Sequence, residues 1–170
     1  MIPERPLWRL MTAADLPAVN VLAALIHPAY PEDDAVFAER LRLYPKGCQV
    51  LVQNGKIAAY VVSHPWVDRA PPALNALLGE LPARPSTYYL HDIALLSDVR
   101  GSGAAAEMVV SLVEQARLER LPSLSLIAVN GSAGFWQRQE FEAVPDGPSA
   151  EKLRSYGADA QFMMRRLSRE

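Results

Sequence analysis

The residues best suited to chemistry lie in one turn of small residues, Arg100–Ala105, which reads RGSGAA. The turn follows an apolar segment typical of a strand and precedes a segment with helical periodicity. Unpaired backbone N–H groups converge at the start of a helix, and the helix dipole adds positive potential there. Small side chains let a phosphate approach this backbone closely, and the Arg100 guanidinium adds a charged donor. The turn therefore predicts a site for a phosphate-bearing ligand.

Two phosphate-binding patterns fit this turn. Gly101, Gly103 and Ala106 match the dinucleotide fingerprint GxGxxG/A, which would indicate a nucleotide-dependent oxidoreductase. That fingerprint starts directly at the strand end and requires an acidic residue at the end of the next strand. Here five residues intervene before Gly101, and Asn130 occupies the acidic position. The second pattern is Arg100-x-x-Gly103-x-Ala105, and the residues around the turn favour it.

The second pattern matches the pyrophosphate-binding motif Q/R-x-x-G-x-G/A, and the chain resembles the GCN5-related N-acetyltransferases (GNAT) over nearly its whole length. The stretch Val129–Phe141 is similar to that family's signature N-x-x-A-x-x-F/Y-Y-x-x-x-G-F, with one residue fewer after the alanine. The segment Tyr89–Leu95 resembles the histidine-bearing strand of the arylalkylamine N-acetyltransferase branch. It keeps the second histidine as His91 and replaces the first by Tyr89.

The resemblance implies an enzyme that moves an acetyl group from acetyl-CoA to a primary amine of a small molecule, without a metal. The amine would be an arylalkylamine or polyamine-like. The motif turn would hold the pyrophosphate, while backbone groups of the preceding strand and the Asn130 side chain would meet the pantetheine arm. The acetyl-CoA contacts expected on this basis are Ile93, Ala94, Leu95, Arg100, Gly101, Ser102, Gly103, Ala104, Ala105, Ala106, Asn130 and Trp136.

Such a reaction needs a base, because an alkylamine with a lysine-like pKa is neutral in only about one molecule in 2,500 at pH 7. His91 is the candidate, since a histidine with an ordinary pKa accepts a proton near neutral pH. A buried structural role is the alternative for His91. Strand alternation predicts that Tyr89, His91 and Ile93 share one face, with Asp92 on the other.

Two positions depart from the family pattern. Trp136 stands where the family has the tyrosine that protonates the departing CoA thiolate, and an indole N–H is not a proton source near neutral pH. Tyr88 or Tyr89 could replace that tyrosine, and Tyr89 is the second catalytic candidate. A catalytically silent acyl-CoA-binding module is an alternative function. Glu140 stands where the family has glycine, and it would be strained there if that position needs positive φ.

The substrate is the least specified part of the expectation. Tyr30, Tyr60, His64 and Trp66 are candidates for an aromatic pocket around the amine, with core packing as the alternative. The acidic run Glu32–Asp34 suits a polyamine, but acidic residues are also typical of a helix start.

These side chains need a scaffold, and the apolar pattern predicts one. The best-defined element is a hairpin, Cys48–Gln53 and Lys56–Val62, around the type I′ turn pair Asn54-Gly55. Residues 64–87, broken by five prolines, predict a lid-like loop with a short helical piece at 74–78. Further strands are expected at 7–11, 88–96, 124–129, 142–144 and 161–167, with helices after Thr12, at 33–43, at 104–119 and around Phe135. The expected fold is α/β (α+β), a single GNAT-like domain spanning 1–170. Its twisted sheet of six or seven strands is mixed, mostly antiparallel, and flanked by about four helices.

Composition narrows the class of partner. The net charge is −2, from 17 basic and 19 acidic residues, and no basic stripe suggests a nucleic-acid partner. Cys48 is the only cysteine, which excludes an internal disulfide and favours core packing. The three histidines lack metal-ligand spacing. With no apolar run of bilayer length and no secretory leader pattern, we expect a cytoplasmic protein without a membrane partner, either a monomer or a homodimer.

Overall fold

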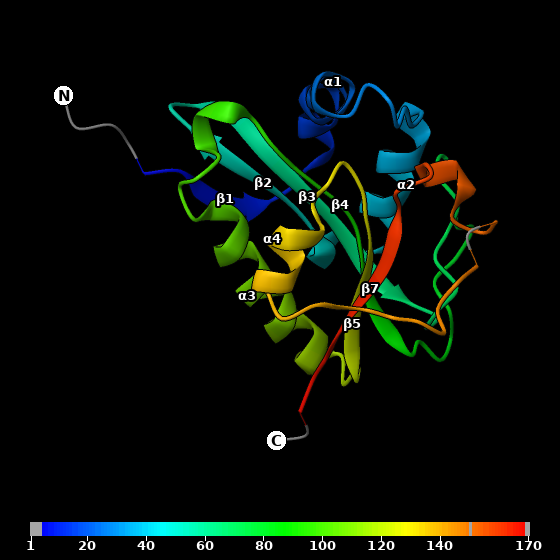
Figure 1. Ribbon diagram of the computed structural model, residues 1–170. Coiled ribbons are helices and arrows are strands. Elements are labelled where there is room, and N and C mark those ends of the chain that lie inside the picture. The colour runs from blue at the N-terminus through cyan, green and yellow to red at the C-terminus, as the bar shows by residue number, and fades with distance from the viewer. Residues whose placement is uncertain (1–4, 150, 169–170) are drawn as a thin grey trace.

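A computed structural model describes residues 5–149 and 151–168 (Figure 1). One sheet carries seven strands in the order β1-β2-β3-β4-β5-β7-β6. The pair β4–β5 is parallel, and the other neighbouring pairs are antiparallel, which confirms the expected mixed sheet. The strands are β1 Leu7–Leu10, β2 Cys48–Gln53, β3 Lys56–Trp66, β4 Thr87–Leu95, β5 Ser123–Ala128, β6 Glu142–Ala143 and β7 Gln161–Arg166. The helices are α1 Leu16–Ile26, α2 Asp34–Leu43, α3 Ala104–Leu118 and α4 Ala133–Arg138.

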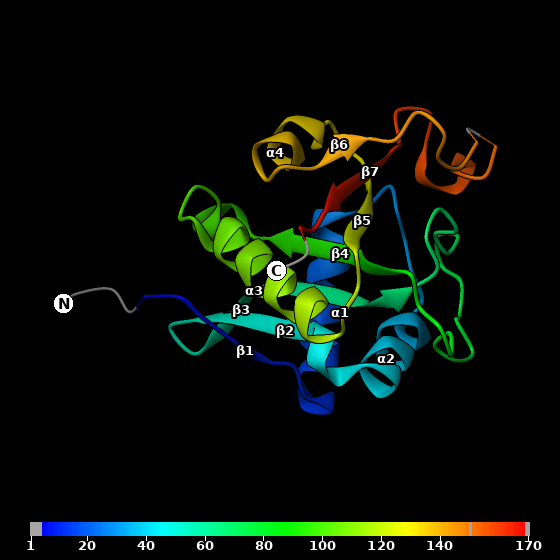
Figure 2. The same ribbon diagram turned by 90° about the horizontal axis from the view of Figure 1, so that it is seen from below.

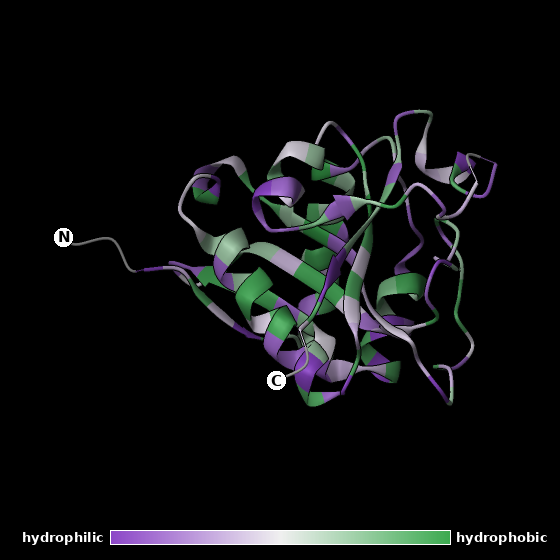
Figure 3. Cartoon of the chain, turned by 60° about the horizontal axis from the view of Figure 1, so that its bottom comes forward, coloured by the Kyte–Doolittle hydropathy of each residue, from purple (hydrophilic) through white to green (hydrophobic). Residues whose placement is uncertain are grey.

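Helices cover both faces of the sheet. In Figure 2, α3 lies in front of the strands and α1 behind them. The apolar stripe of α3, including Met108 and Leu112, packs on Tyr88, Leu90 and Leu124 of the sheet. Helices α1 and α2 form a second core on the opposite face, against β2 and β3. In Figure 3, much of α3 and of the central strands is green, the colour of hydrophobic residues. Each helix thus buries one apolar stripe, as an amphipathic pattern requires.

The hairpin of β2 and β3 is confirmed, and its turn explains its position. Asn54 has φ +52° and Gly55 φ +75°, the positive values that a type I′ turn needs. Cys48 is fully buried at the start of β2, where burial raises the pKa of its thiol to about 12. The residue is therefore part of the core, as expected, and its thiol stays protonated at neutral pH.

Strands β4 and β5 separate before they end. Their parallel pairing covers only Tyr88–Leu90 of β4 against Leu124–Leu126 of β5. Strand β4 nevertheless continues to Leu95 and β5 to Ala128. The ends of the two strands therefore leave backbone groups without a partner strand between them, and this gap opens the molecule to a ligand.

A β-bulge in β4 changes which side chains share a face. Val62 of β3 pairs with Asp92, whereas the next residue, Ser63, pairs with Leu90, so His91 is the extra residue. Ile93 packs on the α3 side, whereas Asp92 bonds to Tyr60 in the α1–α2 core. The expectation that His91 and Ile93 share a face opposite Asp92 is wrong, because a bulge interrupts the alternation that it assumed.

The segment between β3 and β4, residues 67–86, is an irregular loop. The short helical piece expected at 74–78 is absent, since these residues form turns and bends. Within the described residues, no helix is long and apolar enough to cross a bilayer.

Candidate active site

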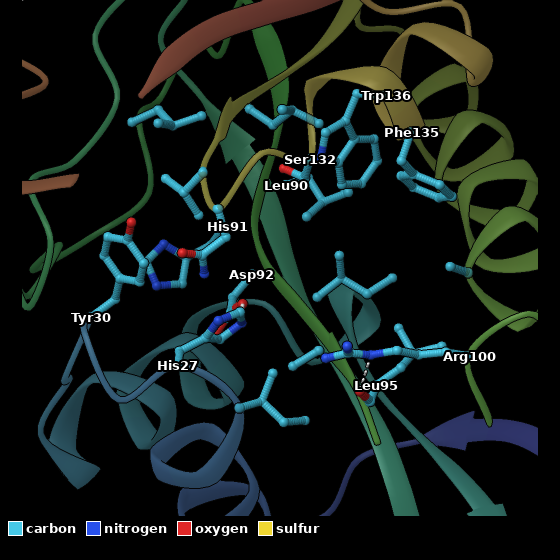
Figure 4. A pocket seen from close by; sticks show the side chains of 18 of the residues that line it. His27, Tyr30, Leu90, His91, Asp92, Leu95, Arg100, Ser132, Phe135 and Trp136 are labelled. Atoms are coloured by element: carbon cyan, nitrogen blue, oxygen red, sulfur yellow. Dashed lines mark hydrogen bonds and ion pairs between the residues drawn. The ribbon is translucent and has the colours of Figure 1, made fainter. Parts of the chain in front are cut away.

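The gap between β4 and β5 opens into a cavity of about 710 Å³ (Figure 4). Its walls come from the C-terminal half of β4, the turn before α3, the segment between β5 and α4, and the connection between α1 and α2. The volume is within the range typical of small-molecule and cofactor sites. The cavity therefore joins the segments that carry the sequence motifs.

One end of the cavity is the glycine turn. Gly101 has φ +78° and Gly103 φ +86°, and Gly103 is the N-cap of α3. A Cβ added at either glycine would meet no atom within 4 Å, so the cradle is open to a ligand. The Nε of Arg100 donates to the carbonyl of Leu95 at 3.1 Å, which ties the turn to the end of β4. This geometry fits a pyrophosphate bound at a helix N-terminus.

Most of the residues expected to hold acetyl-CoA line this cavity. The exception is Ser102, whose Oγ donates to the Val99 carbonyl at 2.5 Å. The ring of Trp136 packs edge-to-face on Phe135 and Phe141, with centroids 4.9 and 5.4 Å apart. The residues that line the cavity are Ile93, Ala94, Leu95, Arg100, Gly101, Gly103, Ala104, Ala105, Ala106, Asn130 and Trp136.

Glu140, which stands where the family motif has glycine, adopts a left-handed backbone conformation. Its φ is +68°, a left-handed value that favours glycine. The Arg165 guanidinium lies 2.9 Å from its carboxylate. The local strain is thus accompanied by an ion pair at the surface.

The opposite end of the cavity holds His91, paired with a carboxylate. Its Nε2 lies 2.8 Å from Oε1 of Glu32, in the connection between α1 and α2. The His91 side chain is 1% exposed and that of Glu32 is 5% exposed. A carboxylate at this distance fixes the orientation of the ring. His91 therefore has the geometry of an oriented general base.

A second histidine–carboxylate pair faces the same cavity. His27 caps the C-terminus of α1, and its Nε2 lies 3.1 Å from Oδ1 of Asp92. The hydroxyl of Tyr60 donates to Oδ2 of the same carboxylate at 2.5 Å. In Figure 4, His27 lies beside Asp92, and His91 lies beside Tyr30.

The candidate substrate residues separate into two groups. Tyr30 lines the cavity, whereas Tyr60 is buried behind Asp92. His64 and Trp66 do not line the cavity. The Nδ1 of His64 lies 2.9 Å from the Pro65 carbonyl, and burial lowers the pKa of this histidine to about 3. The indole N–H of Trp66 donates to the Ala70 carbonyl at 2.8 Å.

Tyr89, the second catalytic candidate, lies outside the cavity lining. It is 1% exposed, and its ring centroid is 6.3 Å from that of His91 and 5.7 Å from that of His64. Burial raises the pKa of its hydroxyl well above the ordinary value. The structure therefore brings Tyr89 next to the candidate base but not to the space where a substrate would lie.

Sequence reasoning missed several residues at this end of the cavity. Glu32 appeared only as part of an acidic run, and His27 was assigned no role. Tyr156, from the 3-10 turn Arg154–Tyr156, also lines the cavity, although 65 residues separate it from His91. Their sequence separations follow no motif, so only the tertiary contacts reveal them.

Loops cover the end of the cavity that holds His91. Leu74 of the 67–86 loop lines the cavity, and the next residue, Asn75, donates its backbone N–H to Oε2 of Glu32 at 3.0 Å. The hydroxyl of Tyr156 donates to the Pro72 carbonyl at 2.9 Å, and this hydrogen bond links the 154–156 turn to the 67–86 loop. Three segments distant in sequence thus enclose the candidate base.

Comparison with known proteins agrees with this geometry. Residues 16–141 match the family model described as the acetyltransferase (GNAT) family. None of the curated proteins compared with the chain matches it.

Solved structures share the fold at low sequence identity. The GNAT-like decarboxylase GphF in complex with isobutyryl-CoA has a TM-score of 0.79 at 16% identity, over 95% of this chain and 100% of that one. The loading GNATL domain of CurA from Lyngbya majuscula has a TM-score of 0.77 at 11% identity, over 96% and 98%. Naa50 of Arabidopsis thaliana, in complex with a bisubstrate analogue, has a TM-score of 0.73 at 11% identity, over 95% and 99%.

Proposed function

Because the chain belongs to the acetyltransferase (GNAT) family, and is thus an acyl-CoA-dependent acetyltransferase, we propose that its acceptor is the primary amine of a small molecule. The observation that carries this proposal is the enclosure of His91, whose side chain is only 1% exposed. A small amine suits a base that is enclosed in this way, and a peptide acceptor is the alternative that the experiment below tests. The histidines, carboxylates and Tyr30 at this end suit an ammonium group with an apolar or aromatic body.

The donor would lie along the cavity from the glycine turn to the end of β4. The N–H groups at the start of α3 and Arg100 bind the pyrophosphate. Ile93, Leu95 and Asn130, which also line the cavity, bind the pantetheine arm. This arrangement directs the thioester toward His91 and Asp92.

The reaction begins with an acceptor that is an ammonium ion at neutral pH. His91, oriented by Glu32, takes a proton from it and so produces the nucleophilic amine. The nitrogen then forms a bond to the acyl carbon, the carbon–sulfur bond breaks, and the electron pair goes to sulfur. A CoA thiol has a pKa near that of cysteine, ~8.5, so it is a good leaving group.

Trp136 keeps one alternative open, a module that binds acyl-CoA without turnover. Its indole N–H is not a proton source near neutral pH. The dinucleotide alternative has lost its support, because the family match covers the motif turn and describes acetyltransferases.

The decisive experiment measures thiol release from acetyl-CoA with arylalkylamines, polyamines, amino acids, aminoglycosides and short peptides with a free N-terminus. Calorimetry of acetyl-CoA and NAD binding accompanies it. We expect release with a small amine and binding of acetyl-CoA but not NAD. Release only with peptides would refute the small-molecule acceptor, and binding without any release would indicate the silent module.

A further inference from the structure

The pair formed by His27 and Asp92 has no role in the reaction described so far. We propose that His27, paired with Asp92, is a second catalytic residue of this site, which takes a proton from the acceptor nitrogen and delivers it to the departing thiolate. This inference rests on the proposed transfer of an acetyl group to an amine.

The contacts of His27 leave one ring nitrogen available. Its Nε2 lies 3.1 Å from Oδ1 of Asp92, within ion-pair distance. Neither this nitrogen nor Nδ1 makes a hydrogen bond of ordinary geometry within the described residues, and Nδ1 has no charged partner. Tyr60 donates to the other oxygen of Asp92, so the carboxylate is fixed on both sides. Because the His27 side chain lines the cavity, a bound ligand can satisfy a buried nitrogen that lacks a hydrogen bond.

The surroundings of His27 suit a group that both accepts and releases a proton. Burial lowers the pKa of His27, but the hydrogen bond and charge of Asp92, with a smaller effect of the Ile93 carbonyl, raise it above the ordinary value. Burial raises the pKa of Asp92, but His27, His91 and Tyr60 together hold it below the usual range. The titratable or charged groups around His27 are Asp92 and His91 from β4, Tyr60 from β3, Arg100 from the turn and Tyr30 from the α1–α2 connection.

The proton balance of the reaction requires two transfers. An ammonium acceptor loses two protons when it becomes an amide, and CoA leaves as a thiol that has gained one. His91 takes the first proton and gives it to solvent. Once the carbon–nitrogen bond has formed, Nδ1 of His27 takes the second, and the same proton then passes to sulfur as the carbon–sulfur bond breaks. His27 ends the cycle neutral, as it began.

Other groups near the cavity are less suited to protonate sulfur. The Trp136 indole is no acid near neutral pH. The hydroxyl of Tyr156 is engaged with the Pro72 carbonyl, and burial raises its pKa. His27 is therefore better suited to protonate the departing thiolate than Trp136, which stands at the motif position of the family's tyrosine.

The test compares the full-length protein with His27→Gln and Asp92→Asn. We expect His27→Gln to lower kcat by about 10²-fold or more, with little change in the Kd for acetyl-CoA. Asp92→Asn keeps the ring but removes the charge that raises the pKa of His27. The acidic limb of its pH–rate profile should therefore move to lower pH.

A direct measurement separates catalysis from folding. The chain has three histidines, so nuclear magnetic resonance can titrate each ring after assignment with single variants. The midpoint of His27 should fall in Asp92→Asn. Asp15→Asn is the matched control, because Asp15 also pairs with a cation, Arg9 at 2.7 Å, but does not line the cavity. It should leave the pH–rate profile unchanged.

Two results would overturn the inference. One is a His27→Gln protein that binds acetyl-CoA and keeps kcat within about threefold of the native chain. The other is an Asp92→Asn protein in which neither the acidic limb nor the His27 titration moves. If only peptides are acetylated, the small-molecule proposal fails, and the same variants are then compared on the active peptide.

Discussion

His91 and Glu32 are the residues whose geometry most directly supports the chemistry. The two side chains are 2.8 Å apart and nearly inaccessible to solvent. The backbone N–H of Asn75 donates a hydrogen bond to the second carboxylate oxygen of Glu32. A hydrogen bond between two buried groups is strong when both remain paired, and removing one partner leaves the other unsatisfied. The orientation of His91 therefore depends on Glu32.

The first prediction concerns this pair. His91→Ala should lower kcat by about 10²–10⁴-fold, because it removes the base that produces the neutral amine. Glu32→Gln should lower kcat less than His91→Ala does, since the amide can still accept a hydrogen bond but carries no charge. Steady-state kinetics over pH 6–9, with calorimetry of acetyl-CoA binding, would measure both effects.

Tyr44→Phe serves as the control for this prediction. Its hydroxyl donates to the carboxylate of Glu119 at 2.7 Å, so it too hydrogen-bonds a carboxylate, but Tyr44 does not line the cavity. It should leave the pH–rate profile as it is. A His91→Ala protein with the pH–rate profile of the native chain would remove His91 as the base.

At the scale of elements, a turn and a bulge bring the chemistry together. The turn before α3 holds two glycines with positive φ over open space, and the bulge at His91 directs that ring and Asp92 toward the α1–α2 connection. Both determine where backbone donors and ionisable side chains point.

The second prediction concerns Gly103. Gly103→Ala should destabilise the fold by roughly 1 kcal/mol, because an L-residue is strained at φ +86°. It should also raise the Kd for acetyl-CoA by at least about tenfold, because the new methyl group would lie in the turn that we propose holds the pyrophosphate. Chemical denaturation and calorimetry would measure the two effects separately.

Gly55→Ala is the matched control for Gly103→Ala. Gly55 has a similar φ of +75° and open space around it, but it lies in the hairpin turn and not at the cavity. We expect a similar loss of stability and an unchanged Kd. An equal loss of acetyl-CoA affinity in both variants would contradict the proposed pyrophosphate site at Gly103.

At the scale of the whole molecule, the cavity is a product of sheet topology. Strand β4 pairs with β3 along its length but with β5 for only three residues. A ligand that fills the gap between them joins the two halves of the sheet. Binding to the folded state alone should therefore stabilise the protein by mass action.

The third prediction follows from this linkage. Acetyl-CoA at 100 times its Kd should stabilise the fold by about 2.7 kcal/mol. For a chain of this length that corresponds to a rise in Tm of roughly 5–10 °C. Thermal unfolding with acetyl-CoA and with NAD at the same concentration would check it. An equal shift with NAD would restore the dinucleotide interpretation of the turn.

The sequence by itself determined the order of the elements, the hairpin and the glycine turn before α3. These features depend on local rules: periodicity for the helices, positive φ at Asn54 and Gly55, and small residues before α3. They also led to the family, because its motifs are contiguous stretches. Local rules also placed His91 on the strand next to the turn.

Only the tertiary structure decided what surrounds His91. The bulge depends on how β3 pairs with β4, and the partners Glu32, Asp92 and Tyr156 come from separate segments of the chain. It also showed Tyr60 and His64 to be buried rather than exposed to a substrate. Burial, charge pairing and ring orientation are set by the segments packed against a residue, and sequence neighbours do not carry that information.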